Sequence, residues 1–226
     1  MPDAKQARKA AQDGFKALGK ESKSLSATID ALGKSAAEHH DALSKLQGAA
    51  WKIKPKPDRN ATIGDNEALR KLWAASRLQQ ASAKYEACRK DAEMSLSKKA
   101  TQASMLNNLI SMTTIAVEQH TGGKAGGANE SRRDNRLIYL ALKGLRDGNR
   151  PLDGAASATT KLPRLLKPLT EKTPISELDS RAEDAKAACT AASEIRAAFD
   201  AFVSAFDDAS KVAAEGFSEA EKKDVA

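Results

Sequence analysis

The stretch ASMLNNLISMTTIAV (residues 103–117) is the least charged part of the chain, and we expect the other helices to pack around it. No Asp, Glu, Lys or Arg lies between Lys99 and Glu118. A helix with apolar side chains around most of its circumference has to be covered by its neighbours. The sequence therefore predicts that this stretch ends a long helix over about residues 66–119. Its large apolar side chains are Leu106, Leu109, Ile110, Met112, Ile115 and Val117.

The composition favours helices over strands. Of 226 residues, 41% are hydrophobic but only 4% are aromatic, and much of the apolar content is alanine. Seams lined by alanine suit long helices packed side by side, because a compact core needs bulkier residues to fill it. Alternating runs of Val, Ile, Thr and aromatics, which are typical of strands, are nearly absent. We predict an all-α fold: one elongated domain over residues 1–226, built as an antiparallel helical bundle with coiled-coil-like long helices.

A heptad pattern predicts the first long helix, over about residues 4–50. Apolar residues recur alternately three and four positions apart, which is the spacing of a narrow seam that packs against partner helices. Gly14, Gly19 and Gly33 weaken the helix, so packing has to supply its stability. The seam positions are Phe15, Leu18, Ser22, Leu25, Ile29, Leu32, Ala36, His39, Leu43, Leu46 and Ala50.

A basic connector, WKIKPKPDRNATIG (residues 51–64), follows this helix. Pro55 and Pro57 deny helical hydrogen bonds and favour extended geometry in the residues before them. We expect Trp51 and Ile53 to anchor the connector on the end of the bundle. Four basic side chains are expected to point to solvent and to form one candidate anion- or partner-binding group: Lys52, Lys54, Lys56 and Arg59.

Asp65 or Asn66 is the expected cap of the second helix. Beyond it, the segment HTGGKAGGANESRRDNR (residues 120–136) is glycine-rich and lacks large apolar residues. It is longer than the usual connections in helical bundles, so we interpret it as either a functional loop or a flexible one. A third rod over about residues 130–170 is expected to be broken into short helical segments by glycines and prolines. The second candidate anion- or partner-binding group is Lys124, Arg132, Arg133 and Arg136.

The last long helix is predicted over about residues 174–214, with Thr173 as its cap and Pro174 at its first position. Its apolar stripe includes the richest aromatic cluster of the chain. The spacing of three and four residues places this cluster on one helix face, so we interpret it as core. Gly216 is the expected end of the helix, and residues 217–226 are expected to form a polar tail. The cluster consists of Phe199, Phe202 and Phe206.

The charge is unevenly distributed along the chain. The net charge is +7, but residues 171–226 carry 13 acidic and 7 basic side chains, whereas residues 61–170 carry 10 and 18. An acidic last helix could balance the basic helices beside it. The alternative is that the basic portion meets a polyanion while the acidic end faces elsewhere.

The N-terminal sequence lacks the apolar region of a conventional signal peptide, and the longest uncharged run is too polar for a standard membrane span. We therefore expect a cytoplasmic protein without a transmembrane helix; export by a non-classical route stays open. Cys88 and Cys189 lie on apolar stripes of different helices, and we interpret both as buried thiols rather than reactive or bridging ones.

The sequence contains no arrangement that identifies an enzyme. Glu38, His39, His40 and Asp41 carry metal-type ligand atoms, but adjacent helical residues point in different directions and cannot close on one ion unaided. The glycine-rich segment matches neither common phosphate-binding spacing. His120 near Glu118 could form an acid and base pair, but a polar residue that ends a helix explains it equally well. We predict no catalytic residue, no metal and no cofactor.

Three functional hypotheses follow. The first is a non-catalytic helical interaction or scaffold protein that binds a protein partner and could also self-associate. The second is a polyanion binder that meets nucleic acid or an anionic membrane surface through its two basic groups. The scarcity of aromatics counts against single-stranded nucleic acid, which is usually held partly by stacking. The third is an enzyme or enzyme modulator that uses the glycine-rich segment and its arginines.

Overall fold

The computed structural model describes residues 4–58, 60–96 and 169–225, together with a set of positions between 137 and 162. The described part of the chain is helical apart from turns, the connector and one isolated bridge, so the all-α prediction is confirmed for it. The glycine-rich segment 120–136, the uncharged stretch 103–117 and most of the predicted third rod lie outside the described residues. Among the described residues, no helix combines the length and apolar character needed to cross a bilayer.

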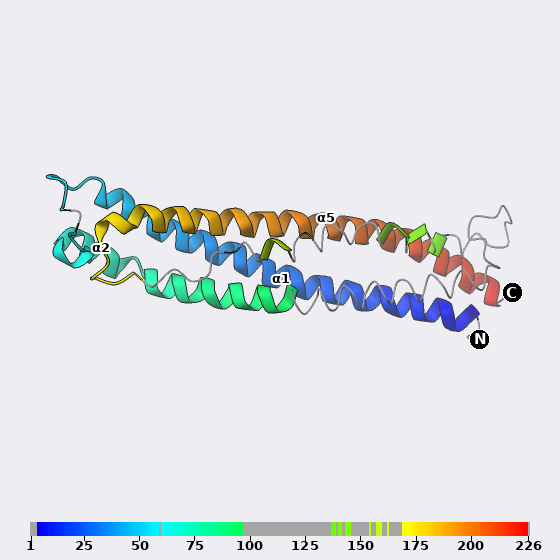
Figure 1. The fold of residues 1–226 in the computed structure, drawn as a ribbon. Helices are drawn as coiled ribbons and strands as arrows, with labels where there is room; N and C mark the ends of the chain where they lie inside the picture. The colour runs from blue at the N-terminus through cyan, green and yellow to red at the C-terminus, as the bar shows by residue number, and fades with distance from the viewer. Residues whose placement is uncertain are drawn as a thin grey trace. The chain divides into compact units, whose positions relative to one another are not determined.

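Two helices account for most of the described residues: α1 over Ala4–Ala50 and α5 over Leu178–Val225 (Figure 1). Between them along the chain come the short turn η1 (Ile63–Asp65), helix α2 (Glu67–Ala75), a helical run over residues 78–96, and the turn η3 (Ile175–Glu177). The bounds of α1 agree with the heptad pattern. The connector after Ala50 leaves the helix before Pro55, as the missing proline N–H requires.

The chain divides into two compact units, and α1 and α5 contribute to both. Unit 1 comprises residues 1–26, 97–156 and 197–226. Unit 2 comprises residues 27–96 and 157–196. The expected single elongated domain stays a prediction.

In unit 2, α1 packs against α5 in the antiparallel sense. Asp30 of α1 forms an ion pair with Arg196 of α5, and Gln47, further along α1, donates to Asp179 near the start of α5 at 2.8 Å. Residue numbers thus rise along one helix as they fall along the other. Residues 78–96 lie against α1 as well, through an ion pair of Lys84 with Glu38 at 2.6 Å.

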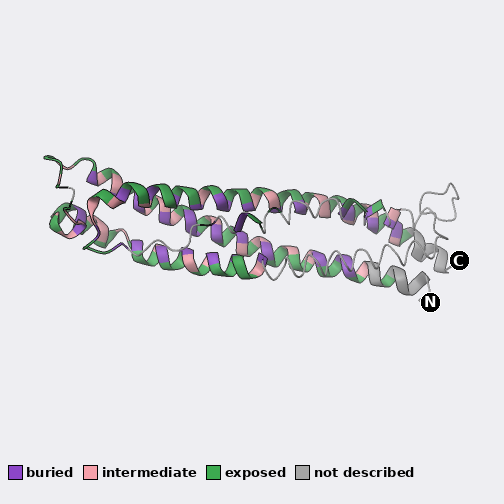
Figure 2. Ribbon diagram, viewed as in Figure 1, coloured by how far each residue is buried: buried purple, intermediate pink, exposed green. Residues whose placement is uncertain are grey.

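The core of unit 2 follows the heptad seam of α1, which Figure 2 shows as buried positions recurring along the helix. Ile29, Leu32, Leu43 and Leu46 are at most 1% exposed. Because one CH₂ group removed from water stabilises the fold by about 0.8 kcal/mol, these aliphatic side chains are a principal source of stability. The residues that cluster with Leu43 and Leu46 are Ala50, Ile63, Leu69, Leu78, Leu169, Leu178, Ala182 and Ala185.

Two connections are joined at the end of unit 2 by main-chain hydrogen bonds. The amide of Gly64 donates to the carbonyl of Glu171 at 2.8 Å, and the amide of Ile175 donates to Ala61 at 2.9 Å. A Cβ atom at Gly64 would lie 3.2 Å from the Glu171 carbonyl oxygen, so the close approach of the two backbones favours glycine there. Because both segments lead directly into helices, this pairing fixes where α2 and α5 begin.

The described core of unit 1 is aromatic. Phe199 and Phe202 on α5 are 0% and 2% exposed, which confirms the core prediction for these two residues. Phe206, the third member of the predicted cluster, is half-buried. Phe15 of α1 contacts two rings of α5, with centroid distances of 6.3 Å to Phe206 and 6.4 Å to Phe217. Among the described residues of the predicted third rod, Ile138, Ala141 and Leu145 are helical and buried at helical spacing.

The predicted continuous helix over residues 66–119 is interrupted at Ser76 and Arg77. The Ser76 hydroxyl donates to the carbonyl of Trp73 at 2.7 Å and accepts from the amide of Leu78 at 3.3 Å. A serine side chain that bonds nearby backbone groups in this way competes with the helix. Arg77 has a φ of 51°, in the left-handed region. The sequence pattern does not reveal this break, because Leu72 and Leu78 continue the apolar stripe across it.

The last helix differs from its prediction at both ends. Thr173 does not cap it: its hydroxyl accepts from the amide of Thr170 at 2.9 Å, and η3 precedes the start of α5. At the other end, α5 runs through Gly216 to Val225, so the predicted polar tail is wrong for the described residues up to 225. Phe217 contacts the ring of Phe15, and this contact offsets the weak helix propensity of the glycine before it.

Candidate functional site

The most exposed large apolar side chain of the described residues is Trp51, at the C-terminal end of α1 in unit 2. Its exposed fraction is 72%, which overturns the expectation that it anchors the connector by burial. Ile53 is half-buried and packs against the core, as predicted. The connector is therefore anchored by Ile53, and its tryptophan is presented to solvent.

Although Trp51 is exposed, its orientation is fixed by hydrogen bonding. Its indole N–H donates to Oδ1 of Asp179 on α5 at 2.9 Å, and the side-chain amide of Gln47 donates to the same oxygen at 2.8 Å. Gln47 and Trp51 lie four residues apart, so they share one face of the helix end. The polar group of the tryptophan is thus satisfied within the protein while the ring remains open to a partner.

Three lysines follow Trp51 at alternate positions in the connector. Lys52, Lys54 and Lys56 are all exposed, as predicted, and none pairs with an acidic side chain among the described residues. We call Trp51 with these three lysines the connector surface. Arg59, the fourth member of this predicted group, lies outside the described residues.

The second predicted basic group cannot be placed. Its members lie outside the described residues, as does His120, so their part in anion or partner binding stays a prediction. The hypothesis of an enzyme or enzyme modulator depends on the same segment and also stays a prediction. These residues are Lys124, Arg132, Arg133 and Arg136.

A second candidate is a polar layer inside unit 2, where α1, residues 78–96 and α5 meet. The ring of His39 stacks on that of Tyr85 with centroids 6.0 Å apart and an interplanar angle of 19°. Ser35, Ser82 and Arg89 are also buried in this part of the unit. Ser82, Tyr85 and Arg89 follow the three- and four-residue spacing of a heptad seam, so this seam carries polar as well as apolar side chains.

Arg89 is neutralised by two glutamates of its own helix. Its Nε and Nη2 atoms donate to both carboxylate oxygens of Glu86 at 2.8 Å, and Nη1 donates to Glu93 at 2.7 Å. The bonds to Glu86 form the parallel pair that matches a guanidinium to a carboxylate. They lower the pKa of Glu86, and the pKa of Arg89 is raised by the same partner. Such a buried pair adds little net stability, because the cost of removing both charges from water offsets their attraction.

Burial also shifts the titratable groups of this layer. The pKa of His39 lies below its usual value, because burial disfavours the charged ring and His40 adds repulsion. Burial raises the pKa of Tyr85 to about 12 and raises that of Cys189 on α5. All three groups are therefore held in their neutral forms near neutral pH. A cluster of shifted groups is a candidate functional site, but the same shifts also describe a polar layer that sets helix alignment.

The residues considered as metal ligands do not converge on one point, although Nδ1 of His40 lies 3.9 Å from Oδ1 of Asp41. Glu38 pairs with Lys84 at 2.6 Å, and that contact lowers the Glu38 pKa. His39 stacks on Tyr85, while a ring nitrogen of His40 lies 3.4 Å from the Ser44 hydroxyl. Within the described part of the chain, no three His, Cys, Asp or Glu side chains are grouped as a metal would require. Cys88 and Cys189 are free thiols of intermediate burial.

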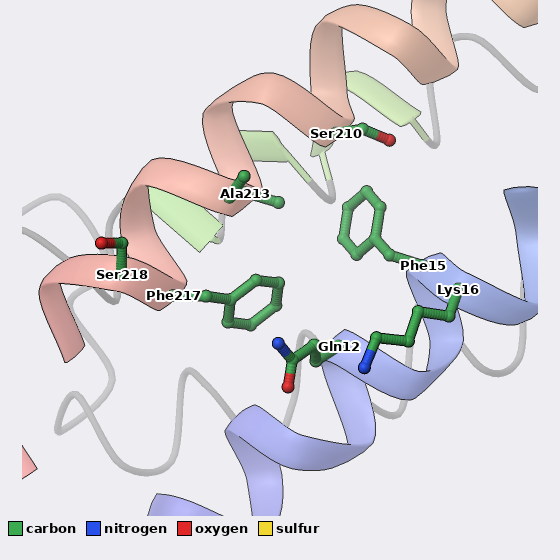
Figure 3. Close-up of a pocket in the computed structure, with 8 residues that line it drawn as sticks. Gln12, Phe15, Lys16, Ser210, Ala213, Phe217 and Ser218 are labelled. Atoms are coloured by element: carbon green, nitrogen blue, oxygen red, sulfur yellow. The ribbon is translucent and has the colours of Figure 1, made fainter. Parts of the chain in front are cut away.

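A third candidate is a pocket in unit 1 between the N-terminal part of α1 and the C-terminal part of α5 (Figure 3). Its volume is about 350 Å³. The rings of Phe15 and Phe217 form its apolar walls and meet nearly edge to face, at 79°. The remaining lining residues are Gln12, Lys16, Ser210, Ala213, Ala214 and Ser218.

Sequence reasoning missed parts of all three candidates. The Trp51 bond to Asp179 joins residues 128 positions apart, and no local pattern signals it. The apolar stripe of the second predicted helix passes through Cys88 and does not predict that Arg89 is buried. Glu86 and Glu93, at helical spacing on either side of Arg89, are the sequence signal for its pairing. Phe217 was assigned to the tail, although its spacing of eleven residues from Phe206 continues the aromatic face.

Comparison with known proteins adds no further assignment: the chain matches no protein family model, and neither curated proteins nor solved structures give a significant match.

Proposed function

We propose that this protein is a non-catalytic helical interaction protein that binds a protein partner through the connector surface. The observation that carries this proposal is Trp51, which is 72% exposed and yet oriented by its 2.9 Å bond to Asp179. Tryptophan is among the residues most enriched where binding energy concentrates in protein interfaces. A side chain already held in one orientation loses less entropy on binding.

The polarity of the connector surface supports the same function. A protein interface combines an apolar centre with a polar, solvent-accessible rim. Here one aromatic ring is adjoined by Lys52, Lys54 and Lys56, all exposed. The arrangement therefore favours a partner with an apolar recess bordered by acidic side chains.

The test compares the full chain with Trp51→Ala and with a matched control, Met94→Ala. Met94 is another exposed large apolar residue of unit 2, at 55%. Proteins captured from the native host would be ranked by their loss on Trp51→Ala, and the leading candidate would be purified and titrated. We expect Trp51→Ala to weaken its binding by about thirtyfold or more, as loss of an interface hot spot does. Equal binding by wild type and Trp51→Ala would remove the connector surface from consideration.

A second candidate function is polyanion binding, favoured by the three exposed lysines without an acidic partner among the described residues. Nucleic acid and anionic membranes would both be bound with an affinity that falls as salt rises. Wild type, Lys52→Gln/Lys54→Gln/Lys56→Gln and Arg132→Ala/Arg133→Ala/Arg136→Ala would be titrated with duplex DNA, RNA and anionic vesicles at two salt concentrations. Absence of salt-sensitive binding by wild type would exclude this function.

A further inference from the structure

We infer that the pocket of unit 1 binds a small carboxylate with an apolar, aromatic body. Its volume of about 350 Å³ lies at the low end of the range of about 300–1,000 Å³ that is usual for ligand sites. Like such sites, it combines apolar walls with a few polar groups. The inference is independent of the connector surface, which belongs to the other unit.

The aromatic walls select the body of the ligand. Phe15 and Phe217 come from different helices, and their centroids lie 6.4 Å apart in an edge-to-face arrangement. Figure 3 shows the two rings reaching from α1 and α5 into the space between these helices. A flat apolar ring is the shape best matched to such walls, because aromatic groups favour offset-stacked and edge-to-face contacts.

The charge of the lining selects the head group. Among the described residues that line the pocket, Lys16 is the one with an ionisable side chain, and it is exposed. No acidic side chain pairs with it among the described residues. Gln12, one turn earlier on α1, adds a neutral amide at the same side (Figure 3). An anionic head group would therefore be attracted here, and a carboxylate can accept hydrogen bonds from both side chains.

Ser210 is a second polar residue of the lining that could respond to a ligand. Its Oγ is buried and has no hydrogen-bond partner among the described residues. Hydroxyls elsewhere in α1 and α5 bond to carbonyls of their own helix: Ser22 donates to Leu18 at 2.9 Å, and Ser193 donates to Cys189 at 2.9 Å. Ser210 makes no such bond and lines the pocket instead. The hydroxyl oxygen is closed off from a water-sized probe, so it meets a ligand only if the Ser210 side chain turns to another rotamer that faces the pocket.

The probe for the first experiment is 1-naphthoate, with uncharged 1-naphthamide of nearly the same shape as its comparison. Both would be titrated calorimetrically into the full chain. We expect saturable binding of the carboxylate with a Kd at or below about 1 mM and weaker binding of the amide. Absence of saturable naphthoate binding, or equal binding of the amide, would overturn the assignment.

Two pairs of variants locate the site. Ala214 lines the pocket and is exposed, so Ala214→Phe would block it without disturbing the core, while Ala201→Phe at an exposed α5 position outside the pocket is the control. Lys16→Gln should raise the naphthoate Kd by about two- to fivefold, as loss of an exposed ion pair does, while Lys20→Gln should not. The site would be contradicted if Ala214→Phe failed to block naphthoate binding or if Ala201→Phe blocked it too. Equal effects of Lys16→Gln and Lys20→Gln would also contradict it.

Ser210→Ala separates a binding role from a structural one. Because the hydroxyl has no partner among the described residues, its removal should leave Tm unchanged or raised. It should weaken naphthoate binding by about two- to tenfold, the effect of one hydrogen bond. A lowered Tm with unchanged binding would show that the hydroxyl belongs to the fold and not to the pocket.

Discussion

His39 of α1 stacks on Tyr85 of the neighbouring helix, with ring centroids 6.0 Å apart, at a seam position that in most heptads is apolar. The imidazole is 5% exposed and its pKa is lowered by burial. The contact thus places a group that titrates near physiological pH inside the core of unit 2.

This burial predicts a loss of stability in mild acid. The folded-state pKa of His39 is lower than its unfolded value of 6.5, so the unfolded chain binds more protons as the pH falls below that value. The contribution of neutral His39 to the free energy of unfolding is fully present above about pH 6.5. It is lost as the pH falls toward the folded-state pKa. Tyr85, which stacks on the ring, and Cys189, which acts electrostatically on Tyr85, stay protonated in this pH range, since their pKa values are raised.

Urea unfolding at about pH 7.5 and about pH 5.5 measures this effect. Wild type should lose more stability between these values than His39→Phe, which keeps an aromatic ring that does not titrate. His40→Gln, which removes the half-buried neighbouring histidine, should behave more like wild type. An equal loss in wild type and His39→Phe would contradict a titrating core histidine.

The ion pair of Arg89 predicts an asymmetric mutational response. Arg89→Ala leaves Glu86 without its bidentate partner, and Glu86 has a side-chain exposure of only 12%. Loss of one partner of a buried pair costs about 3 kcal/mol in unfolding free energy. The double variant Arg89→Met/Glu86→Gln should recover most of this loss, because it removes both charges. Denaturant unfolding should show that the double variant is more stable than Arg89→Ala. Equal free energies of unfolding for the two variants would contradict the prediction.

The aromatic core of unit 1 predicts a large cost for truncating Phe199. This side chain is 0% exposed and lies 6.1 Å, centroid to centroid, from Phe202. Phe199→Ala should lower the unfolding free energy by about 3–5 kcal/mol through lost burial and the cavity left behind. Met94→Ala, at an exposed position, should change it by less than about 0.5 kcal/mol. Comparable effects of the two substitutions in urea would contradict the assignment of Phe199 to the core.

The break between α2 and residues 78–96 predicts that Arg77→Gly is more stable than a variant with a side chain at this position. Arg77 is exposed and has a φ of 51°, which costs an L-residue about 1 kcal/mol relative to glycine. Arg77→Gly should therefore be more stable than Arg77→Ala by up to about 1 kcal/mol, since alanine keeps the strained backbone. The midpoints of urea unfolding measure the difference. A more stable alanine variant would show that the helix prefers to continue through this position.

The sequence alone determined those features that depend on local periodicity. The heptad seam from Phe15 to Ala50 predicted the bounds of α1 and nearly all of its buried positions, because a three- and four-residue spacing places side chains on one helix face whatever packs there. The all-α class and the core role of Phe199 and Phe202 followed from the same reasoning. Of the basic residues chosen as candidates, Lys52, Lys54 and Lys56 are exposed, and their binding role stays a prediction.

Tertiary structure decided the features that depend on contacts between distant residues. Trp51 keeps its ring exposed while its N–H donates to Asp179, and α5 continues past Gly216, where Phe217 meets Phe15. For Arg89 the pairing with Glu86 and Glu93 is local and agrees with their helical spacing, whereas its burial also depends on the helices that pack against residues 78–96. Propensity and periodicity describe what each segment prefers in isolation. Packing energy overrides those preferences wherever another helix supplies the missing partner.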